Sequence, residues 1–212
     1  LILFLPVIGA IIYLVTQVYN KNDANKIQHE ITSILVPTKK VKDLEKQLTF
    51  SETYQNRVNL ADAYLEMKDY SNAITHYEVA IKDKSQNGFH ETKQLVKAYY
   101  GLQDYKQVIS YAEKIKSEPE FENSRAQFIY GLALEEDGNI ALAETTLRKI
   151  DLRYSNYEER LILAKFLLKH NKPVDAKEIL NEILTESQNM TKPNRKLYRA
   201  TILDVQKLIQ TL

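Results

Sequence analysis

The feature that most constrains this chain is a pattern of small and large apolar residues that recurs about every 34 residues. Its first copy begins at Leu60, and the same offsets carry matching residues from Leu95, Tyr130 and Leu163 onward. A period of this length is typical of stacked helical hairpins, because one hairpin cannot bury its apolar face alone. The sequence therefore predicts an all-α solenoid of four hairpins, over residues 54–87, 88–122, 123–156 and 157–189.

Small residues within each copy predict where the two helices of a hairpin touch. In the first helices these residues are Ala61 with Ala63 and Gly131 with Ala133, and in the second helices they are Ala73, Ala143 and Ala176. Larger residues one turn later are expected to fill the groove between neighbouring hairpins, namely Tyr77, Leu147 and Leu180.

Short turns are expected between the two helices of each hairpin. Gly138 and Asn171 stand where a left-handed residue is wanted, and both residue types adopt that conformation readily. Lys68 and Gln103 occupy the same position in their turns, but these residue types adopt the left-handed conformation less readily.

This spacing resembles the tetratricopeptide repeat, whose W-x2-L-G-x2-Y…A-x3-F…P pattern gives the same roles to the same offsets over roughly residues 54–188. The chain departs from that pattern because it has no Trp, and because Val108 and Ala112 stand where a small and then a large residue are usual. That inversion conserves volume, so we interpret it as repacking. The resemblance implies a right-handed superhelix and a concave surface lined by the first helix of each hairpin.

Both ends of the solenoid are expected to carry capping helices. Pro37 is followed by an apolar stripe at Val41, Leu44 and Leu48, so residues 20–53 are predicted to form an amphipathic stalk and an amino-terminal capping helix. Residues 190–212 are predicted to form one carboxyl-terminal capping helix that opens at Pro193. Its apolar face is expected to consist of Leu197, Tyr198, Ile202, Val205 and Leu208.

Residues 1–19 are apolar enough to predict a single transmembrane anchor in a lipid bilayer. At about 1.5 Å per residue they would span about 28 Å, close to the hydrocarbon core. A cleaved signal peptide and a buried helix are the alternatives. The spacing of Pro6, Gly9 and Tyr13 resembles the membrane segment of bacterial phospholipase D-type nucleases and cardiolipin synthases, which implies a bacterial inner membrane. The chain does not begin with Met, and we expect further residues before Leu1.

The lysines that follow residues 1–19 favour a single-pass orientation with the repeats in the cytoplasm. Lys21 and Lys26 come first, then Lys39, Lys40 and Lys42, and basic residues near the end of a span are retained on the cytoplasmic side. Two or three lysines before Leu1 would reverse this expectation and place the solenoid in the periplasm.

Composition argues against several classes of function. The chain has 29 basic and 28 acidic residues, so it has no overall field that would attract nucleic acid, and we expect no nucleic-acid partner. It has no Cys, and its four His are scattered, which disfavours a metal site. No phosphate-binding glycine loop or nucleophile motif is present, so we predict no cofactor, no catalytic residues and no enzymatic activity.

The remaining prediction is that the concave face binds a protein or peptide partner. The alternatives are that this face is only solvated, or that the chain's last helix fills it. Val58 and Asp62 stand where a chaperone-tail clamp would have Lys and Asn, so such a clamp is not supported. The residues expected to face the partner are Asp62, Leu65, Glu66, His90, Lys93, Lys97, Tyr100, Arg125, Phe128, Leu132, Glu135, Lys165 and Lys169.

These observations predict a membrane-anchored scaffold or assembly adaptor. Two alternatives remain open at this point. The chain could be the regulatory subunit of a membrane-associated enzyme, or a purely structural subunit of a larger membrane complex.

Overall fold

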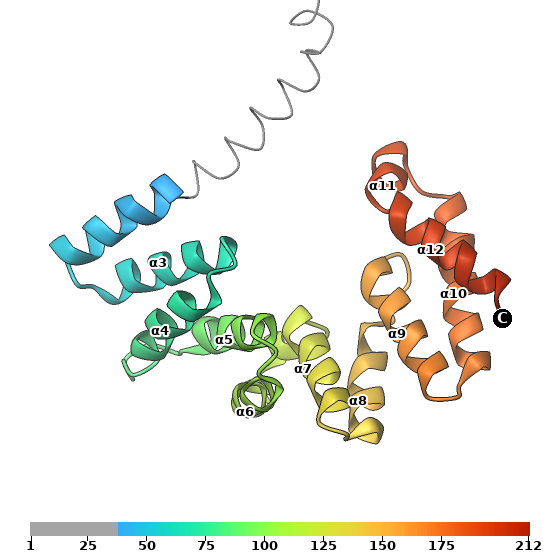
Figure 1. Cartoon of the computed structure of the whole chain (residues 1–212), viewed down its shortest axis with the longest axis horizontal. Coiled ribbons are helices and arrows are strands. Elements are labelled where there is room, and N and C mark those ends of the chain that lie inside the picture. Colours follow the sequence, from blue (N-terminus) through green and yellow to red (C-terminus); the bar gives the residue numbers. More distant parts are fainter. Residues whose placement is uncertain (1–37) are drawn as a thin grey trace, which may run out of the picture.

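The structure, a computed structural model, describes residues 38–212, which form helices joined by turns with no strand among them. Four helical hairpins follow one another in chain order, and Figure 1 shows them along the length of the molecule. The hairpins pair α3 (Tyr54–Glu66) with α4 (Tyr70–Ala80), α5 (Phe89–Gly101) with α6 (Tyr105–Ile115), α7 (Arg125–Glu136) with α8 (Ile140–Leu147), and α9 (Tyr157–Lys169) with α10 (Pro173–Gln188).

The small residues predicted at the contact between the two helices of the first, third and fourth hairpins are buried, as the repeat register requires. Ala73, Ala143 and Ala176 are each 0% exposed. A Cβ atom added to Gly131 would lie 2.7 Å from Cδ2 of Leu147, closer than side chains pack. The absence of a side chain at Gly131 therefore sets how closely α7 approaches α8.

The turn within each hairpin has the same backbone conformation. Lys68, Gln103, Gly138 and Asn171 all have positive φ, with values of 61°, 59°, 84° and 59°. In three of the hairpins the second helix begins directly after this turn and has a side-chain N-cap. A side-chain oxygen of Asp69, Asp104 or Asn139 accepts a hydrogen bond from the backbone N–H three residues later. The fourth hairpin instead opens with a proline at the first position of α10.

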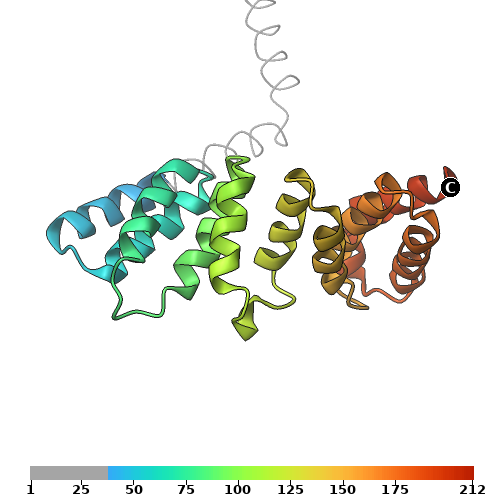
Figure 2. The same cartoon turned by 90° about the horizontal axis from the view of Figure 1, so that it is seen from below.

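Neighbouring hairpins share one apolar core. Helix α4 packs against α5, and α6 packs against α7, so in the first two hairpins the second helix is covered by the next first helix. Val108 and Ala112 are both 0% exposed, which agrees with the predicted repacking at this site. After α8 the chain continues as a short 3₁₀ helix, η2 (Arg148–Ile150), which contacts α9. Figure 2 shows the same row of hairpins turned by 90°.

Residues 38–50 form a helix that covers the outer side of the first hairpin. Val41 is 7% exposed and packs with Leu60 and Ala63, and Leu44 and Leu48 lie against this cluster. The apolar stripe of this helix therefore occupies the face that a preceding repeat would otherwise cover.

The carboxyl end differs from the prediction, because two helices stand where one was expected. They are α11 (Lys192–Leu197) and α12 (Arg199–Gln210), separated by Tyr198, whose ring packs edge-on to Tyr157 at 4.9 Å between centroids. Val205 is fully buried as α12 packs against α9 and α10. Leu197, predicted on the same face, is 68% exposed, because the break at Tyr198 interrupts the helical register.

The predicted membrane anchor over residues 1–19 and the stalk that follows it to residue 37 lie outside the described residues. Among residues 38–212, none of the helices combines the length and the apolar character that crossing a bilayer requires.

Candidate functional site

The first helices of three consecutive hairpins, α3, α5 and α7, line an open hollow of about 550 Å³. Five of the residues predicted to face a partner line it: Leu65 and Glu66 from α3, Lys97 and Tyr100 from α5, and Arg125 from α7. Helix α5 contacts both α3 and α7, so Lys97 and Tyr100 lie on the central helix of the three. No lining residue comes from α11 or α12, so in the described part of the chain the last helices do not fill this hollow.

Six further residues, not predicted from the sequence, line the same hollow, of which Gly101 and Ile129 lie on the first helices α5 and α7 themselves. The missed residues come mainly from the turns and the starts of second helices, and they are Lys68, Tyr70, Gly101, Gln103, Tyr105 and Ile129. A signal was available: Tyr70 and Tyr105 occupy the same offset in successive repeats, as do Lys68 and Gln103. Identical aromatic residues directly after a turn could have been recognised as part of the surface.

Gly101 determines how the Tyr70 ring sits in this hollow. A Cβ atom at Gly101 would clash with the ring atoms of Tyr70, so the ring covers the end of α5 only because no side chain is present there. The same offset carries Glu66 in the first hairpin and Glu136 in the third. The hollow between α3, α5 and α7 is therefore particular to this place in the solenoid.

Asp62 and His90, both predicted to face a partner, bond to each other. His90 Nε2 lies 3.0 Å from Asp62 Oδ1, and the Tyr77 hydroxyl donates to the same oxygen. Burial acts to raise the pKa of Asp62, but the hydrogen bonds from His90 and Tyr77 outweigh it, so this pKa lies below its usual value. The hydrogen bond to Asp62 raises the pKa of His90 above its usual value.

Glu135 and Lys169 are also paired with each other, across the boundary between the third and fourth hairpins. Lys169 Nζ lies 2.8 Å and His170 Nε2 lies 2.9 Å from Glu135 Oε1. Burial acts to raise the pKa of Glu135, and the hydrogen bonds from Lys169 and His170 overcome that effect and lower it. The chain thus neutralises this acidic group with its own Lys169.

The other four predicted residues differ in their accessibility. Phe128 is 4% exposed, and its side chain packs in the core, where it supports α7. Leu132 is partly buried against the same core. The ammonium group of Lys93 lies over the Phe89 ring, 5.2 Å from its centroid, and Lys165 is exposed.

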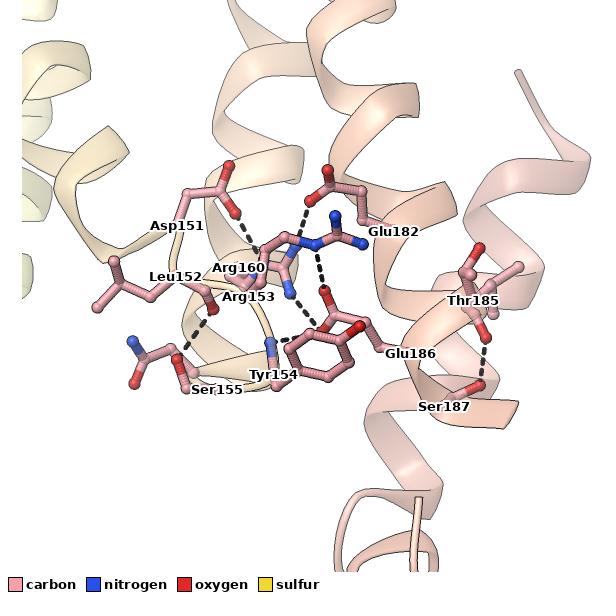
Figure 3. Close-up of polar contacts among 12 residues, drawn as sticks. Asp151, Leu152, Arg153, Tyr154, Ser155, Arg160, Glu182, Thr185, Glu186 and Ser187 are labelled. Atoms are coloured by element: carbon pink, nitrogen blue, oxygen red, sulfur yellow. Dashed lines mark hydrogen bonds and ion pairs between the residues drawn. The ribbon is translucent and has the colours of Figure 1, made fainter. Parts of the chain in front are cut away.

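A second polar cluster, centred on Arg160 of α9, was not anticipated from the sequence. Arg160 is 0% exposed, and Figure 3 shows its guanidinium group between the loop that precedes α9 and two glutamates of α10. Nε donates to Asp151 at 2.7 Å, Nη2 to Glu182 at 2.7 Å, and Nη1 to Glu186 at 3.0 Å. Glu186 also accepts a bond of 2.8 Å from the backbone N–H of Tyr154. These contacts fasten the loop at residues 151–154 to the fourth hairpin.

Within residues 38–212, no three His, Asp or Glu side chains are placed to hold a metal ion together. The polar groups of the hollow belong to Lys, Arg, Tyr, Gln and Glu side chains, and most of them can donate hydrogen bonds. Its arrangement is suited to holding a ligand through apolar contacts and hydrogen bonds.

The comparison with known families concerns the first hairpin. Residues 55–83 match a family model of the tetratricopeptide repeat. No curated protein shows significant sequence similarity to the chain. The resemblance of residues 1–19 to the phospholipase D-type membrane segment stays a prediction.

Solved structures resemble the whole solenoid. MamA from Desulfovibrio magneticus RS-1, residues 41 to the end, superposes with a TM-score of 0.66 at 16% identity, over 79% of this chain and 97% of that one. The fold is that of a tetratricopeptide-repeat solenoid. YrrB, described as a TPR protein with an unusual peptide-binding site, has a TM-score of 0.59 at 15% identity, over 84% of this chain and 88% of YrrB. BtubC from P. vanneervenii has a TM-score of 0.53 at 14% identity, over 82% of each chain.

Proposed function

We propose that this chain is a non-enzymatic scaffold that binds an extended segment of a protein partner in the hollow between α3, α5 and α7. The observation that carries the proposal is the hollow itself, about 550 Å³ in volume and lined from three consecutive first helices. Helical repeat proteins present such concave surfaces to extended partners. YrrB, which has the same fold, is described as having a peptide-binding site.

The lining of the hollow supports a peptide as the ligand. Leu65 and Ile129 supply apolar side chains from the two outer helices, and the rings of Tyr70, Tyr100 and Tyr105 add aromatic surface. The tyrosine hydroxyl groups can bond the backbone of an extended segment, which has unpaired N–H and C=O groups. A site that combines apolar contacts with a few polar groups is typical of ligand binding.

Membrane attachment is the second part of the proposal. Residues 1–19 would tether the solenoid to a bacterial inner membrane, with the repeats in the cytoplasm, because lysines follow the apolar segment. A reporter that is active only after export, fused at Leu212, tests the orientation. Strong activity in intact cells would place the repeats in the periplasm and contradict this part.

A site-specific cross-linking experiment tests the binding site. A photoreactive amino acid is introduced at Leu65, in the hollow, and separately at Leu142, an exposed apolar residue of α8. The full chain is purified in mild detergent after irradiation in cells, and the cross-linked products are identified. We expect one defined protein adduct at Leu65 and none at Leu142.

The same experiment separates the alternatives. Adducts of equal yield at both positions, or none at Leu65, would contradict binding in the hollow. If the adduct at Leu65 is an enzyme whose activity changes on binding, the chain is a regulatory subunit. If an adduct forms only at Leu142, the chain instead packs as a structural subunit through its second helices.

A further inference from the structure

Half of the twelve tyrosines in residues 38–212 donate their hydroxyl group to a carboxylate, and three of the other six line the hollow. Within residues 38–212, tyrosine hydroxyls repeatedly donate to carboxylates. These pairs are Tyr54 with Glu91, Tyr64 with Glu45, Tyr77 with Asp62, Tyr99 and Tyr111 with Glu78, and Tyr130 with Glu113. The hydroxyls of Tyr70, Tyr100 and Tyr105 make no hydrogen bond to any described residue, and all three tyrosines line the hollow.

A charged group of the hollow, Lys97, likewise lacks an ion-pair partner within residues 38–212. Lys97 makes no ion pair with a described residue, although its side chain is half-buried. Burial lowers the pKa of Lys97, the neighbouring charges of Lys93 and Arg125 lower it further, and the charge of Asp62 opposes them only in part. An opposite charge beside Lys97 would offset both effects.

Acidic groups within the hollow do not supply that charge. Glu66 is the acidic residue in the lining, and its carboxylate lies 2.6 Å from Lys40 Nζ. Arg125 bonds Glu159 through Nη1 at 2.6 Å, which leaves its other guanidinium N–H groups for a ligand. Some other charged groups of the first helices are paired within the chain, as Asp62 is with His90 and Glu135 with Lys169, whereas the ammonium group of Lys93 lies over the Phe89 ring.

We propose that the hollow is specific for an acidic side chain, an Asp or Glu within an extended segment of the partner. The carboxylate of this side chain bonds Lys97 and the hydroxyl group of Tyr100. This inference rests on the proposed function and adds the chemistry of the ligand. Arg125 contributes a second positive charge, and Tyr70 and Tyr105 offer further hydroxyl donors.

The arrangement favours an internal side chain over a free carboxyl terminus. The cationic and hydroxyl groups of Lys97 and Tyr100 lie on α5, between apolar Leu65 on α3 and apolar Ile129 on α7. An acidic residue with an apolar neighbour on each side would use all three helices. A chain terminus would leave one of the two apolar contacts unused.

Binding of blocked peptides tests the inference directly. The chain has no tryptophan, so the fluorescence anisotropy of a Trp in the peptide reports binding to the full chain in mild detergent. The probe is an acetylated, amidated peptide pool with a fixed Leu-Glu-Trp centre, and the matched pool has Leu-Gln-Trp. We expect the Glu pool to bind at least about tenfold more tightly than the Gln pool, because it adds a charge-assisted contact.

Variants locate the contact. In Lys97→Gln the Glu pool should lose about tenfold in affinity, whereas the Gln pool should change by less than about twofold. Tyr100→Phe should weaken only the Glu pool, by roughly threefold. Lys177→Gln, at an exposed lysine of α10, is the control and should bind both pools as the unaltered chain does.

The outcomes distinguish this inference from the proposed function. If both pools bind equally and Lys97→Gln changes neither, the preference for an acidic group is wrong, while cross-linking at Leu65 still tests the hollow as a peptide site. If a peptide with a free carboxyl terminus binds and the blocked Glu pool does not, the assignment to an internal side chain is overturned. An equal loss in Lys177→Gln would also overturn it, because the effect would then be one of overall charge.

Discussion

Replacement of Arg160 by methionine should destabilise the solenoid more than any surface substitution. Arg160 is fully buried and bonds three carboxylates, those of Asp151, Glu182 and Glu186, and the Glu186 side chain is itself 1% exposed (Figure 3). Methionine fills a similar volume but leaves these carboxylates without their shared cation. Removing one partner of a buried ion pair costs about 3–5 kcal/mol, because the remaining charge is uncompensated.

The expected change is large enough for thermal unfolding to measure. For a chain of this size, about 1 kcal/mol of unfolding free energy corresponds to roughly 2–4 °C in melting temperature. Arg160→Met should therefore melt roughly 6–20 °C below the unaltered chain, as followed by the helical circular dichroism signal. Arg160→Lys should fall between the two, because an ammonium group keeps the charge but lacks the planar fork that reaches three carboxylates.

Arg153→Met is the matched control. Arg153 approaches the same Glu186 at 3.4 Å, but its side chain is 57% exposed. Since exposed ion pairs stabilise proteins little, this variant should melt with the unaltered chain. If Arg160→Met and Arg153→Met had the same melting temperature, the account of Arg160 as a buried clamp of the fourth hairpin would be refuted.

Two further predictions concern the repeat register and the charges of the first helices. Ala143→Arg should cost several kcal/mol of unfolding free energy, because it forces an unpaired charge into a fully buried contact. The control Lys149→Ala, at an exposed residue, should cost under about 0.5 kcal/mol. Equal melting temperatures of the two variants would contradict the register. Asp62→Asn should lower the pKa of His90, measured by NMR titration of its imidazole. The pKa of His76, which burial and Arg57 lower, should stay unchanged and serves as the control. An unchanged pKa of His90 would contradict its contact with Asp62.

The pH dependence of this contact follows from the two directions of shift. The folded pKa of His90 is raised above 6.5, so its contribution to stability is complete below about pH 6.5 and is lost as the pH rises through the raised value. The folded pKa of Asp62 is lowered below 3.8, so its contribution is present above that pH and is lost as the pH falls through the lowered value. The pair is therefore most stabilising between these limits.

The repeat register could be predicted from the sequence because it depends on residue size alone. Alanine and glycine at fixed offsets mark the closest helix contacts, and the backbone angles at Lys68 and Gln103 follow from the turn that Gly138 and Asn171 indicate. The carboxyl end was less predictable. An apolar pattern continuous over residues 197–208 gave no sign that the helix breaks at Tyr198, whose ring packs edge-on to Tyr157.

The candidate site was only partly predictable, for two physical reasons. The concave positions of the first helices follow from helical periodicity, and this placed Leu65, Lys97 and Arg125 at one hollow. Periodicity does not show which charges pair across hairpins, since the bond between Glu135 and Lys169 joins residues far apart in sequence. It also does not show that Tyr70 can enter the hollow, because that depends on the absence of a side chain at Gly101, one repeat later.

Amide hydrogen exchange of the full chain, with and without its captured partner, tests the central claim most directly, because it compares all surfaces at once. Binding in the hollow predicts slower exchange in α3, α5 and α7, with α8 and α10 unchanged. Slower exchange confined to α4, α6 and α8, or to α11 and α12, would contradict the claim that the partner binds between the first helices.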